Sequence, residues 1–318
     1  MRGFIKYILI WFFTVFVLLE FTLRLFDLSA KTMPTTSLNN DYVFKPNSSG
    51  TWIRGGLAEL KNYYSINNLG YNSSINYNDL SENDLNIALI GDSYIQGFQT
   101  DVRNSIGRQL EGIINPNKTV VHEFGRAGAN IVDYHKVYKQ FIQPKNYDFV
   151  FILITDKDLE RYKPSYMNRG DRVPKKDFTR KIYDLSYVLR YLNINQGIGT
   201  HFSKLISNGP ESFERIAQEK SIKSETSKKE YINRINLEII NKIPDDIIFI
   251  HEKEKLSDYF IDNFNFNFVE IRHDLQPFNH GFDSHWNFNG RRNCATSIAR
   301  YIRQNPKRAS QPNKGVDL

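Results

Sequence analysis

The 318-residue sequence predicts a three-layer α/β fold, with helices on both faces of a parallel β-sheet, preceded by a transmembrane helix. Three features of the sequence support this prediction. A long apolar run lies near the N-terminus. Short apolar strand patterns then alternate with amphipathic helix patterns between residues 86 and 154. Finally, a Gly-Asp-Ser turn directly follows the first of these strands, as expected where a buried parallel strand leads into a helix.

The N-terminal segment is apolar enough to cross a membrane. Tyr7–Leu19 contains no charged residue, and its flanks are also apolar. Because Lys6 and Arg24 can snorkel to the interfaces, we predict one transmembrane helix at about Phe4–Phe26. A cleaved signal peptide is the alternative, but Leu28-Ser29-Ala30 is a poor cleavage site because it lacks a small residue three positions before the cut. We expect a single-pass protein of the cytoplasmic membrane, with its main domain outside the cytoplasm.

The next segment, residues 32–84, is polar and rich in Asn and Ser. Alternating residues in Tyr63–Tyr71, followed by an Asn-Leu-Gly turn, predict a short strand there. We interpret residues 1–31 as the membrane anchor and residues 32–84 as a juxtamembrane strap that belongs to the following domain.

The main domain is predicted at residues 85–305. In the first predicted helix, Ile106, Leu110, Ile113 and Ile114 have the spacing of a helix packed on a sheet. The predicted strands are Asn86–Ile90, Thr119–Phe124, Tyr147–Ile154, Ile247–Ile250 and Asn267–Ile271, and the predicted helices are Asn104–Ile114, Ile131–Phe141 and Arg291–Ile302.

Residues 156–245 depart from this alternation. They contain several prolines, a basic run at Arg172–Lys181 and a pattern at Tyr231–Ile240 that predicts a long helix. We predict a helical insertion that shapes a substrate cleft or forms a lid, although a solvated helical excursion would explain the pattern nearly as well. The polar tail at residues 306–318 is predicted to be disordered.

The charge and residue composition of the chain indicate which classes of molecule it binds. Lysine and arginine exceed acidic residues by seven, but the excess is scattered along the chain. We therefore expect a surface facing anionic lipid or an acidic polymer, and no nucleic-acid binding. Cys294 is the only cysteine, so no intrachain disulfide can form. The histidines lack metal-ligand spacing, and the Gly-Asp-Ser turn lacks the Gly-Lys pair of a phosphate loop, so no metal or cofactor is expected.

Two separated segments carry residues suited to nucleophilic catalysis. Ser93 lies where a strand ends and a helix begins, so backbone N–H groups point toward what its hydroxyl would attack. Asp283 lies two residues before His285, and a carboxylate at that spacing can hold an imidazole in one tautomer. Taken separately, a helix cap at Asp92 or Ser93 and a surface Asp-x-His pair would explain these residues as well.

Together, the motifs resemble those of the SGNH (GDSL-type) hydrolases, from about Asn86 to Arg303. The matching blocks are Gly91-Asp92-Ser93, Phe124-Gly125-Arg126-Ala127-Gly128, and Asp283 with His285. The resemblance implies a flavodoxin-like parallel sheet, with Ser93 as nucleophile, His285 as base and Asp283 orienting it. The backbone N–H groups of Ser93 and Gly128 would bind the oxyanion.

The third block of this family departs from its usual Gly-x-Asn-Asp pattern. Asp158 matches, but Lys157 stands at the asparagine position, or Asp156 if the alignment shifts by one residue. Lys157 would serve as a third oxyanion donor or would equally well point to solvent, whereas a carboxylate at Asp156 would repel the developing charge.

The segment Asp283-Ser284-His285-Trp286 is similar to the Asp-x-His-Trp form of bacterial O-acetyltransferases that modify exported polysaccharides. The resemblance implies a membrane-anchored serine esterase or O-acyltransferase that removes or transfers O-acetyl groups of a cell-surface or exported glycan, through an acyl-enzyme on Ser93. Trp286 is a candidate to stack on the sugar, although packing would also explain a tryptophan beside a loop. Proteins of a polysaccharide export or modification system are the expected partners. The alternatives are a non-catalytic glycan-binding or assembly subunit with a degenerate site and, more distantly, an anionic-lipid-binding scaffold.

Overall fold

A computed structural model describes residues 2–38, 41–78, 80–81, 84–159, 178–195, 239–253, 255–263, 266–274, 276–278 and 283–306. The chain divides into two compact units. Unit 1 comprises Met1–Met33, Thr51–Asn62 and Pro174–Lys223, and unit 2 comprises Pro34–Gly50, Tyr63–Val173 and Ser224–Leu318. The segment predicted as a strap, residues 32–84, is therefore shared between the two units.

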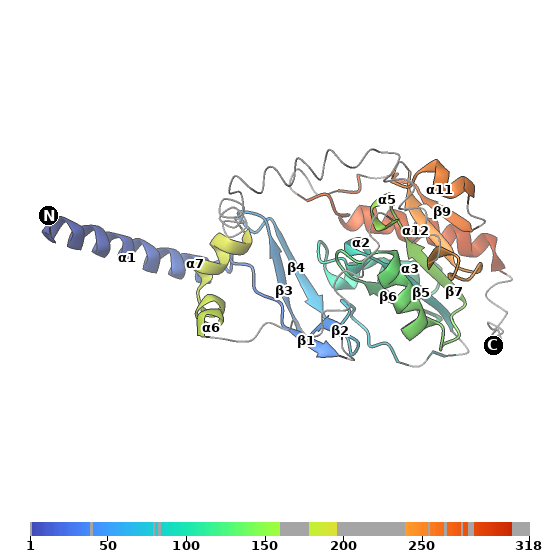
Figure 1. The fold of residues 1–318 in the computed structure, drawn as a ribbon, viewed down its shortest axis with the longest axis horizontal. Helices are drawn as coiled ribbons and strands as arrows, with labels where there is room; N and C mark the ends of the chain where they lie inside the picture. Colours follow the sequence, from blue (N-terminus) through green and yellow to red (C-terminus); the bar gives the residue numbers. More distant parts are fainter. Residues whose placement is uncertain are drawn as a thin grey trace. The chain divides into compact units, whose positions relative to one another are not determined.

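Unit 2 is built around five parallel strands (Figure 1). They are β5 (Leu85–Gly91), β6 (Thr119–Gly125), β7 (Phe149–Leu153), β8 (Ile248–Glu252) and β9 (Asn267–Ile271). Their order is β6-β5-β7-β8-β9, which in chain order is the 2-1-3-4-5 arrangement of flavodoxin-like sheets. The predicted fold class is confirmed, and each of the five strands predicted in the main domain matches an observed one to within two residues at each end.

Helices cover both faces of this sheet. Successive strand residues point to opposite faces, so Leu89 and Ile90 on β5 belong to different hydrophobic clusters. The cluster containing Leu89 includes residues of α3 (Ile106–Ile114) and α12 (Phe288–Gln304). The cluster containing Ile90 includes residues of α4 (Ile131–Val137) and α11 (Asp258–Asn263). The result is the predicted three-layer arrangement.

The helix ends follow local capping rules. Ser105 caps α3 by accepting a hydrogen bond from the Arg108 N–H, after a short 3₁₀ turn, η1 (Val102–Asn104). Asn130 and Asp133 form a capping box at the start of α4. This helix continues as a π-helical turn, η2 (Tyr138–Ile142), so the helix predicted at Ile131–Phe141 is observed with a change of hydrogen-bond pattern.

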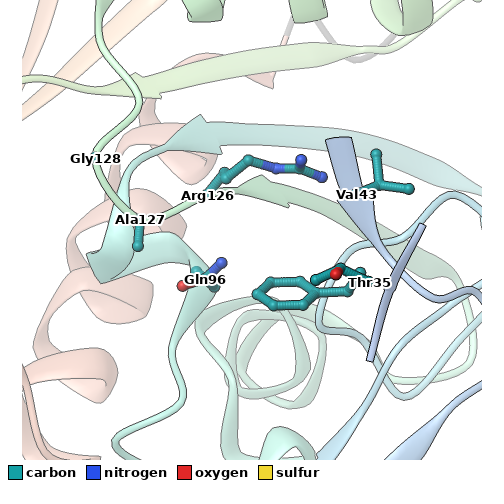
Figure 2. Close-up of a pocket in the computed structure, with 7 residues that line it drawn as sticks. Thr35, Val43, Gln96, Arg126, Ala127 and Gly128 are labelled. Atoms are coloured by element: carbon teal, nitrogen blue, oxygen red, sulfur yellow. The ribbon is translucent and has the colours of Figure 1, made fainter. Parts of the chain in front are cut away.

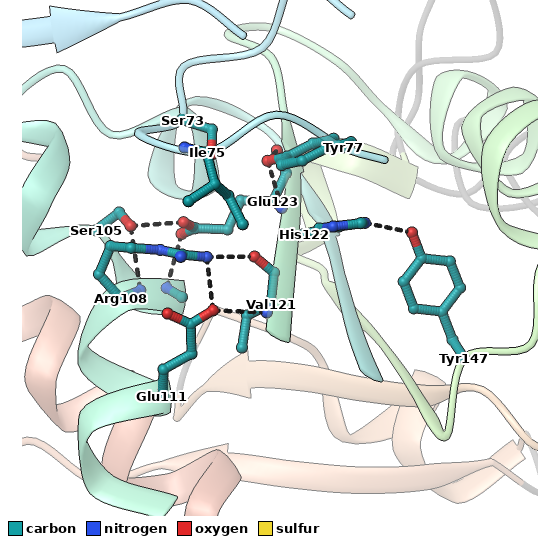
Figure 3. Close-up of polar contacts among 11 residues, drawn as sticks. Ser73, Ile75, Tyr77, Ser105, Arg108, Glu111, Val121, His122, Glu123 and Tyr147 are labelled. Atoms are coloured by element: carbon teal, nitrogen blue, oxygen red, sulfur yellow. Dashed lines mark hydrogen bonds and ion pairs between the residues drawn. The ribbon is translucent and has the colours of Figure 1, made fainter. Parts of the chain in front are cut away.

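Strand β6 is held to α3 by a buried polar network, shown in Figure 3. The Glu123 carboxylate accepts hydrogen bonds from Ser105 Oγ (2.5 Å) and the Gly107 N–H (2.9 Å). The Glu123 N–H donates to Tyr77 Oη, at 2.6 Å. Burial raises the pKa of Glu123, although Arg108 and these donors favour its ionised form. Because these bonds fix the last residues of β6, they also fix the start of the loop that contains Gly128.

Gly125 ends β6 against α2 (Ser93–Gln96). A Cβ atom added at Gly125 would overlap backbone atoms of Ile95 and Gln96, which cannot move aside without shifting the helix. The glycine therefore permits the close approach of β6 to the helix that begins with Ser93.

Two short antiparallel sheets precede the main sheet in the chain. Strands β1 (Thr35–Leu38) and β2 (Asp41–Phe44) form a hairpin within unit 2. Strand β3 (Ser49–Arg54) pairs with β4 (Leu60–Ser65). The strand predicted in Tyr63–Tyr71 thus begins earlier, and the chain turns at Gly70, whose φ is +83°.

Unit 1 contains α1 (Arg2–Leu25), which agrees with the helix predicted at about Phe4–Phe26. Its segment Gly3–Leu25 has a mean hydropathy of 2.1 and is long enough to cross a membrane, a property that an N-terminal signal sequence would share. In the most apolar part of this helix, only 6% of the residues are buried, unlike a soluble core helix. Unit 1 also contains α6 (Phe178–Leu185), α7 (Tyr187–Arg190) and the π-helical turn η4 (Tyr191–Asn195).

Parts of two predictions lie outside the described residues. Within the predicted insertion, the structure describes α5 (Asp156–Leu159), α6, α7 and η4. The long helix predicted at Tyr231–Ile240 is described only at its last two residues, and the predicted tail only at Pro306. The basic run Arg172–Lys181 lies largely outside the described part as well.

We predict that Gly125→Ala destabilises the protein by about 1–3 kcal/mol, because its methyl group would overlap backbone atoms of α2. The matched control is Gly112→Ala within α3, where an added Cβ meets no atom within 4 Å. That substitution should stabilise the helix by roughly 0.5–1 kcal/mol. Urea unfolding of the full-length chain in detergent measures both, and equal effects would contradict the packing described for Gly125.

Candidate active site

Ser93 lies at the carboxyl edge of the sheet. It follows β5, which is flanked by β6 and β7, so it sits where the strand order reverses and ligands commonly bind in such sheets. The Asp92 carboxylate caps α2 by accepting a hydrogen bond from the Tyr94 N–H, at 2.9 Å. The helix ends after one turn at Gly97, which has a left-handed conformation with φ of +72°. The predicted strand–turn–helix arrangement is therefore present.

His285 lies beside Ser93 although 192 positions separate them in the sequence. Its Nε2 atom is 2.8 Å from Ser93 Oγ. On the other side of the ring, Nδ1 is 2.6 Å from Asp283 Oδ1, which also accepts the His285 backbone N–H at 2.8 Å. With a proton on Nδ1 donated to Asp283, Nε2 is free to accept the proton of the serine hydroxyl.

Burial differs among these side chains. The Asp283 side chain is 5% exposed and that of His285 is 28% exposed. The carboxylate is thus enclosed where it can orient the ring, whereas the imidazole remains open to solvent on the side of a prospective substrate. Serine, histidine and aspartate therefore have the arrangement of a nucleophile, a base and an orienting group.

Tyr94 supports the histidine loop, a role that we did not predict from the sequence. Its hydroxyl donates to the Ser284 carbonyl at 3.1 Å, and its ring centroid lies 5.2 Å from that of His285. Lys255 Nζ lies 3.2 Å from the Tyr94 hydroxyl. The residue directly after Ser93 thus holds the backbone between Asp283 and His285.

Glu252, at the end of β8, also holds the loop that carries Asp283 and His285, through Trp286. Its side chain is buried and accepts hydrogen bonds from Trp286 Nε1, Lys255 Nζ and, at 3.0 Å, His273 Nε2. Burial alone would raise the pKa of Glu252, but the bonds from His273 and Lys255 outweigh it, so the pKa is lowered. The sequence signal was an acidic residue at the end of a buried strand, and that end lies at the same edge of the sheet as Ser93.

The position of Trp286 contradicts the prediction that its side chain binds a sugar. It is only 1% exposed and belongs to the hydrophobic cluster that includes α3 and α12. Because its indole ring is buried and its N–H is directed to Glu252, Trp286 packs beneath the histidine loop instead of facing a substrate.

The loop after β6 carries the second predicted oxyanion donor. The Arg126 N–H donates to the Gly91 carbonyl at 3.1 Å, which joins this loop to the strand that precedes Ser93. Gly128 has φ of +73°, a conformation that favours glycine. The loop therefore lies at the same edge of the sheet as Ser93, in line with the predicted position of Gly128.

The third-block residues occupy α5, and Asp158 is the one directed inward. Its carboxylate accepts hydrogen bonds from the Thr155 N–H (2.8 Å) and Thr155 Oγ1 (2.9 Å). Burial and the nearby Asp92 carboxylate raise the pKa of Asp158 to about 7. Burial also raises the pKa of Asp92. Two carboxyl groups with a raised pKa thus lie close to one another beside the nucleophile.

Lys157 and Asp156 are placed differently from Asp158. Lys157 is exposed and makes no hydrogen bond or ion pair in the described part of the chain, so its predicted role as an oxyanion donor gains no support. Asp156 Oδ1 accepts the Ser257 N–H at 3.0 Å, which directs this carboxylate toward the segment before α11. Within the described residues, no group of three or more His, Cys, Asp and Glu side chains could hold a metal ion.

A cavity of about 300 Å³ adjoins the Gly128 loop (Figure 2). Gln96 of the nucleophile helix lines it together with Gly128, and the Arg126 side chain extends across it toward Val43 of β2. The Arg126 guanidinium also lies 5.4 Å from the centroid of the Tyr71 ring. The remaining lining residues are Thr35, Phe44 and Ala127. The hairpin β1–β2 therefore forms one wall of a space beside the candidate oxyanion site.

We predict that Asp158→Asn changes the pH dependence of stability. In the folded protein Asp158 has a pKa of about 7 against a usual value of 3.8, so folding takes up a proton between these pH values. This contribution is full below about pH 4 and is lost as the pH rises to about 7. From pH 4 to 8, the Tm of Asp158→Asn should therefore rise by roughly 6 °C relative to the wild type.

The matched control is Asp245→Asn, which alters an exposed carboxylate. Its Tm difference from the wild type should remain constant across the same range. A constant difference for Asp158→Asn as well would show that Asp158 is not held in its protonated form near neutral pH.

Among known proteins, matches were found only among solved structures. No protein-family model matches the chain, and a search of curated proteins found no similar sequence. A crystal structure of a lipolytic G-D-S-L family member from Veillonella parvula is 10% identical, with a TM-score of 0.32, and the alignment covers 69% of this chain and 98% of that one. A carbohydrate esterase family 2 enzyme with a carbohydrate-binding domain, from Corynascus thermopiles (Myceliophthora fergusii), is 11% identical, with a TM-score of 0.34, over 72% and 68% of the respective chains.

Proposed function

We propose that the protein is a membrane-anchored serine esterase or O-acyltransferase that forms an acyl-enzyme on Ser93. The observation that carries this proposal is the contact of Ser93 Oγ with His285 Nε2 at 2.8 Å, together with that of His285 Nδ1 with Asp283 at 2.6 Å. A serine hydroxyl is a weak nucleophile unless a base accepts its proton, and this arrangement supplies both the base and the group that orients it.

The reaction would proceed in two halves. His285 takes the hydroxyl proton as Ser93 Oγ attacks the ester carbonyl carbon, and Asp283 stabilises the imidazolium that forms. The backbone N–H groups of Ser93 and Gly128 would bind the oxyanion, each contributing roughly 3 kcal/mol. Collapse of this intermediate breaks the ester C–O bond, and His285 returns the proton to the leaving alcohol. A second hydroxyl then attacks the carbonyl carbon of the acyl-enzyme with His285 again as the base, the bond from that carbon to Ser93 Oγ breaks, and His285 returns the proton to Ser93 Oγ.

The second hydroxyl decides between the two activities. Water as the acceptor gives hydrolysis, and a sugar hydroxyl gives acyl transfer. We propose O-acetyl groups of an exported or cell-surface glycan as the substrate, with the domain outside the cytoplasmic membrane. Two features support this choice: the apolar α1 helix, and a cavity with apolar walls and polar side chains of Gln96 and Arg126 beside the Gly128 loop. Proteins of a polysaccharide export or modification system remain proposed partners.

The catalytic assignment is tested with the full-length protein in detergent. Ser93→Ala and Asp283→Asn should each reduce p-nitrophenyl acetate turnover by about 10⁴-fold, because either change removes a member of the serine–histidine–aspartate unit. Ser284→Ala is the matched control, since only the backbone carbonyl of Ser284 holds Tyr94. A fluorophosphonate should add covalently to Ser93, as detected by intact mass and peptide mapping.

Folding of each variant is checked by circular dichroism. If wild-type and Ser93→Ala proteins show equal turnover and neither is modified by the fluorophosphonate, the protein is not a serine esterase. A non-catalytic glycan-binding or assembly subunit, the alternative function, would give that result.

The cavity is tested by filling it. Ala127→Trp places a bulky side chain in the space between the Gly128 loop and the β1–β2 hairpin. It should reduce kcat/KM for an O-acetylated sugar at least about 10-fold more than kcat/KM for p-nitrophenyl acetate, because only the sugar extends into the cavity. Ser37→Trp, an exposed position on β1, is the matched control. Equal losses of kcat/KM for both substrates would show that the sugar does not bind in this cavity.

A further inference from the structure

Glu20 is an acidic residue within the apolar helix α1, and its carboxylate is fully engaged. It accepts hydrogen bonds from the backbone N–H groups of Tyr187 (2.9 Å) and Val188 (3.0 Å) and from Ser186 Oγ (3.0 Å). Arg24, one turn further along α1, donates to it from Nε at 2.8 Å. Glu20 thus binds the first turn of α7, which Figure 1 shows beside the C-terminal end of α1.

A second set of contacts holds the other end of the α7–η4 segment. The Asn195 side chain accepts the Ala30 N–H at 3.0 Å and donates to the Leu28 carbonyl at 3.1 Å, both directly after α1. Arg24 Nη2 also donates to the Leu185 carbonyl, at 2.6 Å. The segment from Leu185 to Asn195 is therefore fixed to α1 and to the chain that leaves it.

These contacts define the depth of the segment if α1 spans a bilayer, as proposed above. Glu20 lies five residues before the end of α1 at Leu25, which at a rise of about 1.5 Å per residue is about 8 Å along the axis. The headgroup layer on each side of a bilayer is about 6 Å thick. The start of α7 therefore lies near the boundary between headgroups and acyl chains.

Apolar side chains are exposed on this same segment. The exposed fractions are 69% for Leu185, 38% for Leu189 and 39% for Leu192, and that of Ile182 on α6 is 45%. Such side chains are unfavourable in water but are stabilised in the interface of a bilayer. Unit 1 also carries the basic residues Arg24, Lys31 and Lys61, each in an ion pair with Glu20 or Asp27, so it is the apolar side chains that favour a bilayer.

We infer that Leu185–Asn195, together with the end of α6, lies in the interfacial layer of a phospholipid bilayer and that α1 remains part of the mature protein. Cleavage after Ala30, the signal-peptide alternative, would remove both Glu20 and the Leu28 carbonyl. The N–H groups at the start of α7 would then lose their acceptor, and Asn195 would lose a partner. This inference rests on the proposed membrane anchoring and assigns its partner surface as lipid.

The inference is tested with the full-length protein in phosphatidylcholine–phosphatidylglycerol vesicles. Single cysteines replacing Leu185 or Leu189 are labelled with a nitroxide, and collisions with oxygen and with a water-soluble nickel chelate are measured. The native Cys294 is fully buried, so wild-type protein treated with the same nitroxide reagent should remain unlabelled and is the control for specificity. Both labels should show an oxygen-to-nickel accessibility ratio several-fold higher than that of a label at the exposed, polar Asn193.

A label replacing Phe13 in the middle of α1 tests the anchor separately. If the label at Phe13 collides with oxygen but not with the nickel chelate, while the labels at Leu185 and Leu189 collide with the nickel chelate, the interfacial assignment is overturned. The anchor is then still supported. Nickel accessibility at Phe13 would instead show that α1 is not inserted, which contradicts the proposed anchoring and the inference with it. A label at Asn193 shielded as strongly as that at Leu189 would place the segment inside the hydrocarbon, which also contradicts the inference.

The role of Glu20 is measured in the protein labelled at Leu189. Glu20→Ala should raise nickel accessibility and label mobility at least two-fold, because α7 loses its acceptor on α1. Thr22→Ala is the matched control, since among the residues that the structure describes Thr22 Oγ1 bonds only to the Leu18 carbonyl within α1. Equal responses of the two variants would show that Glu20 does not fix the depth of this segment.

The retention of α1 is tested by mass spectrometry of the protein isolated from membranes. The residues of α1 should be present, and an N-terminus at Lys31 would contradict their retention.

Discussion

The hydrogen bond between Ser93 and His285 depends on two helices of unit 2 being held together at one edge of the sheet. Ser93 begins α2, and His285 lies just before α12, which packs on the sheet together with α3. The buried Arg291 of α12 donates to the Tyr94 carbonyl of α2 at 3.0 Å. Because α12 is bonded directly to the nucleophile helix, the two halves of the candidate site cannot separate without breaking buried contacts.

The loop between Asp283 and His285 is held from several directions at once. Tyr94 bonds its backbone at Ser284, and Glu252 binds the indole of Trp286 directly after the histidine. Lys255 connects the two supports because its ammonium contacts both Glu252 and the Tyr94 hydroxyl. A catalytic imidazole needs a fixed orientation, and these contacts provide it through groups that would not touch a substrate.

Carboxyl groups at this edge differ in what surrounds them, and that difference separates their roles. Glu252 is stabilised as an anion by His273 and Lys255, so its pKa is lowered despite burial. Asp158 has hydroxyl and amide donors but lies near Asp92, and burial raises its pKa to about 7. In unit 1, Glu20 is surrounded by two backbone N–H groups, a serine hydroxyl and Arg24. The same functional group thus orients the loop that carries His285 in unit 2 and holds a helix against α1 in unit 1.

The sequence by itself determined the sheet, its helices and the apolar N-terminal helix, because each rests on local periodicity that tertiary contacts reinforced. It also pointed to Ser93, Asp283 and His285, but only through the combined resemblance of the motifs to the SGNH (GDSL-type) hydrolases, since a helix cap and a surface Asp-x-His pair would explain them separately. Tertiary structure alone decided that Trp286 is buried, that Asp158 and not Lys157 faces inward, and that Tyr94, Glu252 and Lys255 support the site. Burial and side-chain direction at these positions depend on contacts between residues far apart in the sequence, which no local pattern encodes.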